Sequence, residues 1–260
     1  MKISTFNVNS IRARKDLVIE WLKKRGDIDI LSLQELKCQE EDFPFEDFKK
    51  IGFFCEVFGQ KAYNGVAICS KYKFDEVYKG FGDKYWDREK RFIRARINGI
   101  DILNVYAPHG EIEGEKHIYK LKFYLFLKEY IKNNFNLNSS KLILLGDMNV
   151  ARDEIDVWDP NLLEGSIGFM DDERRYFEEL LSIGLIDLYR ELHPKEHGFT
   201  WWDYRNGAIW RDYGMRIDYI LASSNLAKRC KDIEVDKWSR KRRKPTPSDH
   251  APAVAWFDLN

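Results

Sequence analysis

The chain has 260 residues, enough for one large domain or two small ones with a sizeable hydrophobic core. Its 44% hydrophobic and 33% charged residues are typical of a globular protein, and no apolar stretch approaches the roughly 20 residues that a membrane-spanning helix needs. The 43 basic and 43 acidic side chains give a formal net charge of zero, so any affinity for nucleic acid must come from local basic patches.

The four cysteines carry no recognisable metal-binding spacing. Cys38, Cys55, Cys69 and Cys230 are scattered, without a CxxC pair. We therefore expect reduced thiols in a cytosolic type of compartment. The N-terminus enters a predicted strand at once, so we expect no signal peptide and a cytoplasmic location, at the nucleoid if the source is prokaryotic. The helices show no coiled-coil repeat, and we expect a monomer.

Predicted helices and strands alternate along the whole chain. Helices are predicted over residues 11–25, 116–135 and 171–183, and the first ends in basic residues before Gly26. Strands are predicted over residues 2–6, 28–33, 53–58, 65–69, 92–97, 100–105, 141–145, 219–221 and 253–257. No low-complexity linker interrupts this alternation, which predicts a single α/β domain over residues 1–260.

The predicted strands are connected in two different ways. Residues 92–97 and 100–105 flank Asn98-Gly99, a strong hairpin signal, whereas other strands are separated by helices. A purely parallel sheet is therefore not expected, and two mixed sheets packed face to face with helices outside fit better. Residues 150–170 have few periodic apolar positions and are predicted to form a long loop, a kind of segment that is usually functional or disordered.

The tetrapeptide Gly146-Asp147-Met148-Asn149 follows the apolar run over residues 141–145. Because strand side chains alternate, Asp147 and Asn149 are expected on one face at the end of a buried strand. A carboxylate beside a carboxamide suits the holding of a water and a phosphoryl oxygen next to a metal ion. Taken alone, the same residues are more typical of a turn.

Similar polar residues recur at the ends of other predicted strands. They are Asn7 and Asn9, Glu35, Tyr106, Asp218, Asp249 and His250. Any one of them could be a strand terminus without a role. Together they are hard to explain as turns, and they predict one polar cluster if the strands share packed sheets.

Seven short motifs now carry a resemblance to a known family. In chain order they are Phe6-Asn7-Val8-Asn9, Leu33-Gln34-Glu35, Asn104-Val105-Tyr106-Ala107-Pro108, Gly146-Asp147-Met148-Asn149, Trp202-Asp203-Tyr204-Arg205, Arg216-Ile217-Asp218-Tyr219 and Ser248-Asp249-His250-Ala251-Pro252. The chain resembles exonuclease III-type apurinic/apyrimidinic (AP) endonucleases of the endonuclease/exonuclease/phosphatase superfamily. Each motif is weak alone, but seven in the family's order from residue 6 to residue 252 are specific. The resemblance implies a four-layer α/β sandwich with one Mg²⁺-dependent site.

The resemblance also implies a metal shell and a group that activates water. Glu35, with Asn7 and Asp249 nearby, is implied to hold the metal, and such oxygen ligands suit Mg²⁺, or Mn²⁺ as a substitute, better than zinc. Asp147 is implied to align and deprotonate the attacking water. Asn149 is implied to hold that water or the phosphate.

Further roles follow from the same resemblance. Tyr106 and His250 are implied to donate hydrogen bonds to phosphoryl oxygens, with Asp218 orienting the imidazole. Asp147, Asn149 and His250 remain possible ligands of a second metal ion. The position of Asn9 carries Asp in some relatives and Asn in others, so its metal role is left open and we place it with the substrate-binding residues.

The choice of substrate depends on surface residues. The segments around Trp201 and Met215 resemble those that line a small apolar pocket for a flipped-out abasic sugar, and flipping is cheapest where a base is missing. The alternative is that Trp201, and still more Trp202, belong to the core.

Basic residues fit the same substrate. Arg91, Arg242 and Arg243 are expected to contact the DNA backbone. Residues 240–244 could alternatively be a nuclear localisation signal, and any single basic residue could be an ordinary solvated charge.

These residues together predict a Mg²⁺-dependent DNA repair nuclease. It would incise duplex DNA 5′ to abasic sites, with 3′→5′ exonuclease activity and removal of 3′-blocking groups as side activities. One alternative is a superfamily phosphatase or an RNA nuclease, which the Trp201 and Met215 segments disfavour. The other is a catalytically inactive DNA-binding relative, which would require that an expected catalytic residue be replaced.

Overall fold

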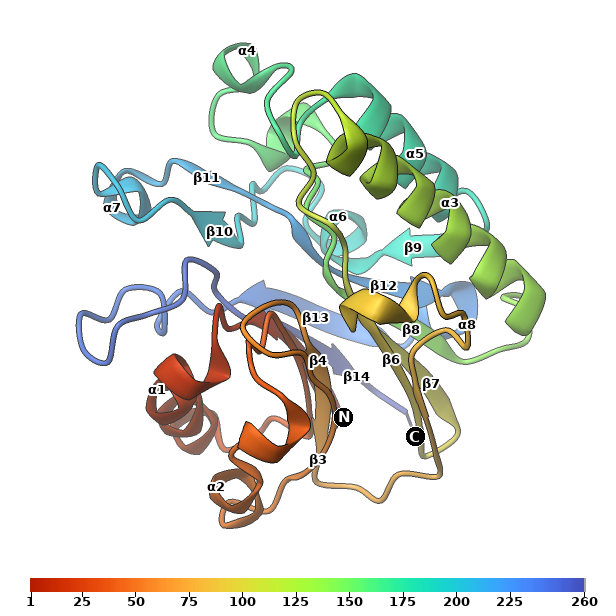
Figure 1. Ribbon diagram of the computed structural model, residues 1–260, viewed down its shortest axis with the longest axis vertical. Coiled ribbons are helices and arrows are strands. Elements are labelled where there is room, and N and C mark those ends of the chain that lie inside the picture. The colour runs from red at the N-terminus through yellow and green to blue at the C-terminus, as the bar shows by residue number, and fades with distance from the viewer. Residues whose placement is uncertain (260) are drawn as a thin grey trace.

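Two six-stranded mixed sheets packed face to face form the centre of the computed structural model, which describes residues 1–259. Helices cover the outer face of each sheet (Figure 1). The expected α/β class and four-layer arrangement are confirmed. Among the described residues, no helix is both long and apolar enough to cross a membrane.

The first sheet has the strand order β13-β14-β1-β2-β4-β3. Its strands are β13 (Cys230–Val235), β14 (Ala253–Phe257), β1 (Lys2–Asn7), β2 (Ile30–Gln34), β4 (Val66–Ser70) and β3 (Phe54–Phe58). Only β1 and β2 run parallel to each other in this sheet. Helices α1 (Ile11–Arg25) and α2 (Phe45–Lys49) pack on its outer face.

The second sheet has the strand order β5-β6-β7-β8-β12-β9. Its strands are β5 (Glu76–Lys79), β6 (Phe92–Ile97), β7 (Ile100–Tyr106), β8 (Leu142–Asp147), β12 (Asp218–Ser223) and β9 (Leu185–Asp187). Only β7 and β8 are parallel. Its outer face is covered by α3 (Glu115–Asn134) and α5 (Asp171–Leu181), while α6 (Leu188–Leu192) and α8 (Ser224–Ala227) flank β12.

Burial explains why these segments form strands and helices. Every residue of β8 is buried, as expected for a strand covered on both faces by a second sheet and by helices. Helix α1 places Val18, Trp21 and Leu22 against the first sheet and ends at Gly26, whose φ of 68° is left-handed.

A buried amide bridge joins the two sheets beside the apolar core. The Gln34 Nε2 donates to Asn104 Oδ1 at 2.6 Å. The Asn104 Nδ2 donates to the carbonyls of Leu33 at 2.9 Å and Ala67 at 2.8 Å, both in the opposite sheet. The bridge lies one residue before Glu35 on one sheet and two residues before Tyr106 on the other.

The sheet topology brings the polar strand ends together. Strands β1 and β2 end at the same edge because they are parallel, and β7 and β8 do likewise. Strand β12 is antiparallel to β8, so Asp218 at its start lies opposite Asp147. Gly146 permits the close approach of β8 to its other neighbour β7, because a Cβ there would lie 1.9 Å from the carbonyl oxygen of Val105.

Several elements were not predicted. The segment over residues 150–170 is ordered and contains the 3₁₀ helix η3 (Glu154–Asp156) and helix α4 (Pro160–Leu163). A two-stranded ribbon is formed by β10 (Trp201–Trp202) and β11 (Gly214–Met215), with α7 (Ala208–Arg211) between them. The short helices η1 (Glu40–Asp42) and η2 (Asp87–Glu89) and strands β5, β9 and β13 also escaped the sequence patterns.

The prediction of four reduced thiols is wrong for two of the cysteines. Cys55 and Cys69 form a disulfide, because they stand directly opposite each other on the antiparallel strands β3 and β4 with their Cα atoms 4.0 Å apart. Cys38 and Cys230 are free and buried. Strand register decided the pairing, and spacing along the sequence does not reveal register.

Candidate active site

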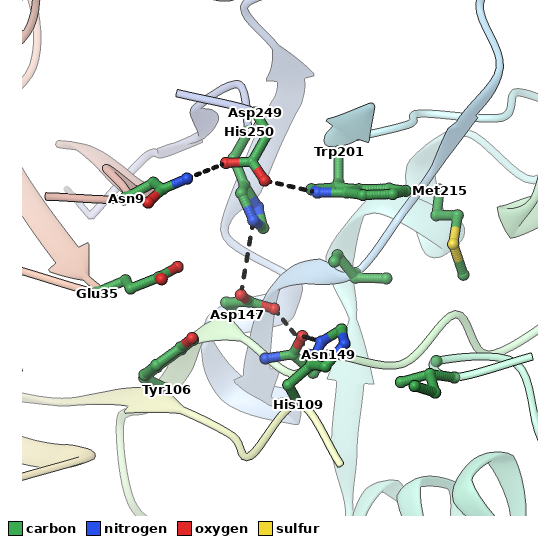
Figure 2. A pocket seen from close by; sticks show the side chains of 13 residues that line it. Asn9, Glu35, Tyr106, His109, Asp147, Asn149, Trp201, Met215, Asp249 and His250 are labelled. Carbon is green, nitrogen blue, oxygen red and sulfur yellow. Dashed lines mark hydrogen bonds and ion pairs between the residues drawn. The ribbon is translucent and has the colours of Figure 1, made fainter. Parts of the chain in front are cut away.

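A cavity of about 370 Å³ lies where the strand ends converge. Figure 2 shows the side chains that line it. One end is polar, with Asn9, Glu35, Tyr106, His109, Asp147, Asn149, Asp249 and His250. The other end is mainly apolar, with Ile167, Gly168, Trp201, Met215 and Ile217. The cavity therefore joins groups suited to acid–base chemistry to a recess suited to an apolar group.

Asp147 is buried at the centre of the polar end. The Asn7 Nδ2 donates to its Oδ2 at 2.8 Å, and the backbone N–H of Asn149 donates to its Oδ1 at 2.8 Å. Burial and the nearby Asp218 carboxylate raise the pKa of Asp147. A raised pKa increases the ability of a carboxylate to accept a proton from water near neutral pH.

Asn149 lies beside Asp147 because of a turn, and not because of strand alternation as predicted. Strand β8 ends at Asp147, and Asn149 has a left-handed φ of 53° in the turn that follows. Strand alternation therefore does not place the pair. The Asn149 Nδ2 donates to the carbonyl of Ala107 at 2.8 Å, which orients its side chain at the cavity.

His250 is held between two carboxylates. Its Nδ1 lies 2.8 Å from Asp218 Oδ2, and its Nε2 lies 3.8 Å from Asp147 Oδ2. Burial acts to lower the pKa of His250, but Asp218 and Asp147 outweigh burial and raise it. The imidazolium form, which donates from both nitrogens, is therefore favoured, and Asp218 lies within hydrogen-bond distance of the ring. Its orienting role stays a prediction.

The carboxylates at the polar end fit a divalent cation. Glu35, Asp147 and Asp249 contribute oxygen atoms to the same end of the cavity, and oxygen atoms are the donors that hard cations prefer. The Lys37 Nζ lies 2.8 Å from Glu35 Oε1. Asp147, Asp218 and His250 also form a buried group whose possible ligand atoms all lie within 4.8 Å of one another, so a second cation position is geometrically available.

Asn7 and Asn9 occupy different positions. Asn7 lies behind Asp147 and is not among the cavity-lining residues; its Oδ1 accepts the backbone N–H of Asn9 at 2.9 Å. Asn9 lines the cavity and donates to Asp249 Oδ1 at 3.0 Å. Direct metal binding by Asn7 stays a prediction, whereas its contact with Asp147 is a feature of the structure.

Tyr106 faces Glu35 and Asp147 across the polar end (Figure 2). Burial, together with these two carboxylates, raises the pKa of its phenol well above the usual value, which keeps the hydroxyl protonated as a donor. Arg91 packs behind it: the guanidinium lies 4.9 Å from the Tyr106 ring centroid and donates to the Tyr106 carbonyl at 3.2 Å.

The apolar end is built on the β10–β11 ribbon. Trp201 and Met215 are cross-strand partners and both line the cavity. The indole N–H of Trp201 donates to Asp249 Oδ2 at 3.0 Å, which links the apolar wall to the polar end. Trp202, in contrast, is fully buried, as the core interpretation expected.

The predicted basic contacts lie outside the cavity. Arg91 is largely buried and supports Tyr106. Arg242 is partly exposed, pairs with Glu20 at 3.1 Å and stacks on Trp238, and Arg243 is exposed. Arg240 in the same segment is buried and donates to the carbonyls of Asp249 and Trp202.

Sequence reasoning missed His109 and Lys120. His109 lines the cavity, and its Nδ1 lies 3.2 Å from Asn149 Oδ1. It directly follows the Tyr106-Ala107-Pro108 motif, which was the available signal. Lys120 is fully buried in α3 and pairs with Glu173, but a lysine in a helix gives no signal that distinguishes it from a solvated one.

Comparison with known proteins agrees with this geometry. A model of the endonuclease/exonuclease/phosphatase family matches residues 4–250. Exodeoxyribonuclease III of Haemophilus influenzae is 34% identical over 270 residues, covering 99% of this chain and 100% of that protein.

Two solved structures are closely similar over nearly the whole chain. An AP endonuclease from Archaeoglobus fulgidus is 43% identical with a TM-score of 0.95, covering 100% of both chains. A 3′ phosphatase from Neisseria, bound to a product DNA hairpin, is 38% identical with a TM-score of 0.93, covering 99% of both chains. The protein therefore belongs to the exonuclease III/AP endonuclease family of the endonuclease/exonuclease/phosphatase superfamily and is a hydrolase of this type.

Proposed function

We propose that the protein is a Mg²⁺-dependent DNA repair nuclease that hydrolyses the phosphodiester 5′ to an abasic site and leaves a 3′-hydroxyl. Exonucleolysis from 3′ ends and removal of 3′-blocking groups accompany this activity, because each is the same phosphoryl attack at a different position on the strand. The observation that carries the proposal is one cavity with hydrolytic groups at one end and the Trp201–Met215 recess at the other.

Related proteins support the reaction class but differ in their named activities. The Archaeoglobus relative is an AP endonuclease, the Haemophilus relative is an exodeoxyribonuclease III, and the Neisseria relative is a 3′ phosphatase. The mixture of activities in this chain is therefore argued from its own residues.

The residues at the polar end divide the chemistry among them. Asp147, with its raised pKa, accepts the proton of the attacking water, and the Asn149 carboxamide orients that water or a phosphoryl oxygen. The Tyr106 hydroxyl and the His250 imidazolium donate to phosphoryl oxygens, where negative charge grows in the transition state. Asp218 acts through the imidazole by holding Nδ1.

A bound Mg²⁺ would supply electrostatic stabilisation of the phosphoryl group and of the leaving oxygen. Glu35, Asp249 and Asn7 would hold it, and Mn²⁺ would substitute because it accepts similar oxygen ligands. In the alternative with a second ion, Asp147, Asn149 and His250 would contact it, and His250 would then be the neutral imidazole in place of the imidazolium donor.

Substrate selection belongs to the apolar end. The Trp201 ring and the Met215 side chain offer a flat wall and a short apolar contact, which suit a deoxyribose without a base. Asn9 at the rim would contact the strand, and Arg242 and Arg243 would contact phosphates of the duplex outside the cavity. Arg91 would contribute indirectly, through Tyr106. We expect the protein to act as a monomer in the cytoplasm or at the nucleoid.

The proposal is tested with a fluorescent duplex that carries one abasic analogue, incubated with Mg²⁺ and, separately, with EDTA. Mg²⁺-dependent incision 5′ to the analogue supports the proposal, and an undamaged duplex of the same sequence measures the exonuclease activity. Incision that continues in EDTA would contradict the proposed requirement for a metal ion. Cleavage of RNA or of a small phosphomonoester, with the abasic duplex untouched, would favour the alternative substrates, and binding without cleavage would favour a silent relative.

A further inference from the structure

A buried ion pair lies between the outer helices and the cavity wall. Lys120 on α3 and Glu173 on α5 are both fully buried, with Nζ and Oε1 2.6 Å apart. Neither side chain lines the cavity. Burying an ion pair away from water destabilises the fold unless the remaining donors and acceptors form hydrogen bonds. The other hydrogen-bond partners of Lys120 and Glu173 therefore show which segments the pair holds.

The other two N–H donors of the Lys120 ammonium group donate to backbone carbonyls of the cavity wall. Its Nζ donates to the carbonyl of His109 at 3.0 Å and to that of Asn149 at 2.7 Å. The loop fits closely around the lysine stem, because residue 110 is a glycine with φ of 83° and a Cβ there would lie 2.9 Å from Lys120 Cδ. The ammonium thus joins the loop after β7 to the turn after β8.

Glu173 extends the connection to a third segment. Its Oε2 accepts the backbone N–H of Gly168 at 2.7 Å and that of Met170 at 3.2 Å. Gly168 lines the cavity beside Met215, as His109 and Asn149 line it on the polar side. One buried pair therefore fixes three separate cavity-lining positions.

We propose that Lys120 and Glu173 are positioning residues that set the relative placement of His109, Asn149 and Gly168, and that they control turnover of the phosphoryl transfer without contacting the substrate. The proposal rests on the proposed nuclease function. Its physical basis is that a reacting group displaced by about 1 Å through a remote change can lose about 10²-fold in rate.

Three substitutions test the pair. Lys120→Met removes the charge and all three donors at similar volume. Glu173→Gln keeps the shape but cannot accept at both oxygens. We expect each to lower kcat on the abasic duplex by about 10- to 100-fold, while KM and the affinity for uncleaved duplex change by less than about 3-fold. Lys120→Arg keeps the charge and several donors. The decrease in log kcat should therefore be at most half of the decrease in Lys120→Met.

The matched control is Arg94→Met. Arg94 pairs with Asp101 at 2.8 Å near the opposite end of β7, and both side chains are about one-tenth exposed. This variant also breaks a largely buried ion pair but should leave kcat unchanged at a temperature where the protein is folded. If Lys120→Met and Glu173→Gln lost only thermal stability, with normal kcat below their unfolding transitions, the positioning role would be overturned.

A substrate-free measurement separates this proposal from the nuclease assignment. The Gly168 amide donates to a carboxylate, so its proton resonance should lie at unusually low field in an ¹⁵N-correlated spectrum and move upfield in Glu173→Gln, and the His109 and Asn149 regions should shift in Lys120→Met. If the wild type failed to incise abasic DNA while these shifts occurred, the proposed function would fail and the connection would stand. Unchanged spectra in both variants would overturn the connection itself.

Discussion

The two ends of the cavity are built in different ways. The polar end consists of residues at or next to the termini of strands in both central sheets, such as Glu35, Tyr106, Asp147 and His250. The apolar end consists of the short β10–β11 ribbon and the loop around Gly168, which lie outside the central sheets. Strand termini are fixed by the hydrogen bonds of the sheet, whereas ribbons and loops tolerate change. The groups proposed for chemistry and for substrate choice therefore lie on different parts of the fold, which are joined by the hydrogen bond between Trp201 and Asp249.

Asp147→Asn is the strongest test of the polar end. The carboxamide keeps the shape, but it can accept only one of the two hydrogen bonds made to the carboxylate oxygens and cannot accept a proton from water. We therefore expect kcat to fall by at least ~10²-fold, while affinity for an abasic duplex holds or rises. Single-turnover kinetics and a binding titration in the absence of cleavage measure the two effects. Nearly normal turnover in this variant would remove Asp147 from the role of base.

Glu35→Gln tests the metal at the same end. The change preserves shape but removes the charge that a hard cation needs, so activity at low Mg²⁺ should fall by at least ~10-fold and recover in part at high Mg²⁺. The measurement is the Mg²⁺ dependence of kcat. Lys37→Met serves as the comparison, because it removes the partner of Glu35 without removing the carboxylate. A Mg²⁺ dependence identical to that of the wild type would contradict the assignment.

The 2.8 Å contact between Asp218 and His250 predicts strong coupling. If Asp218 acts through the imidazole, Asp218→Ala should add little once His250 is already Ala, with a coupling free energy of about 1 kcal/mol or more in a double-mutant cycle on kcat. Fully additive effects would show that Asp218 acts independently of the ring.

The apolar end is tested by replacing Trp201 and Met215 together with Ala. Removing the stacking ring and the apolar side chain should cost about 1–3 kcal/mol in binding a flipped abasic sugar and should change the ratio of abasic-site incision to 3′→5′ digestion. The Mg²⁺ dependence should change only as far as the lost hydrogen bond from Trp201 affects Asp249. Trp201 also donates a hydrogen bond to Asp249. Trp201→Phe keeps an aromatic ring but loses this N–H, so it separates the effect of losing the ring from the effect of losing the hydrogen bond. Equal loss of both activities at normal thermal stability would contradict the separation of the two ends.

The smallest effect is expected outside the cavity. Arg242→Ala with Arg243→Ala should weaken all duplex substrates alike and reduce the slope of log affinity against log salt by about 1 for each DNA phosphate that the protein no longer neutralises. The salt dependence of the affinity for abasic and intact duplexes measures this. A change confined to abasic duplexes would instead give these arginines a part in selectivity.

Regular elements were predictable where the sequence contains local signals. Helix α1 was predicted at its true bounds because its apolar face and Gly26 define it, and the Asn98-Gly99 turn defined the β6–β7 hairpin. The convergence of polar strand ends was also predictable, because parallel neighbours end at the same edge.

Features that depend on packing and register were not predictable. The disulfide between Cys55 and Cys69 follows from strand register, and the meeting of Asn149 with Asp147 follows from a left-handed turn. The packing of Arg91 against Tyr106 was not predicted, and its contact with DNA stays a prediction. Lys120 is buried by tertiary contacts that a helical pattern does not encode.

The Gln34–Asn104 bridge has a consequence for the alignment of the two halves of the site. Glu35 follows β2 and His250 precedes β14 of one sheet, whereas Tyr106 and Asp147 end β7 and β8 of the other, so the width of the cavity depends on how far one sheet can slide over the other. Apolar contacts between sheets are non-directional and resist sliding weakly, whereas the directional hydrogen bonds of the Asn104 carboxamide fix a single offset. The amide side chains of Gln34 and Asn104 therefore act against shear between the layers, within two residues of Glu35 and Tyr106, whose spacing the reaction requires.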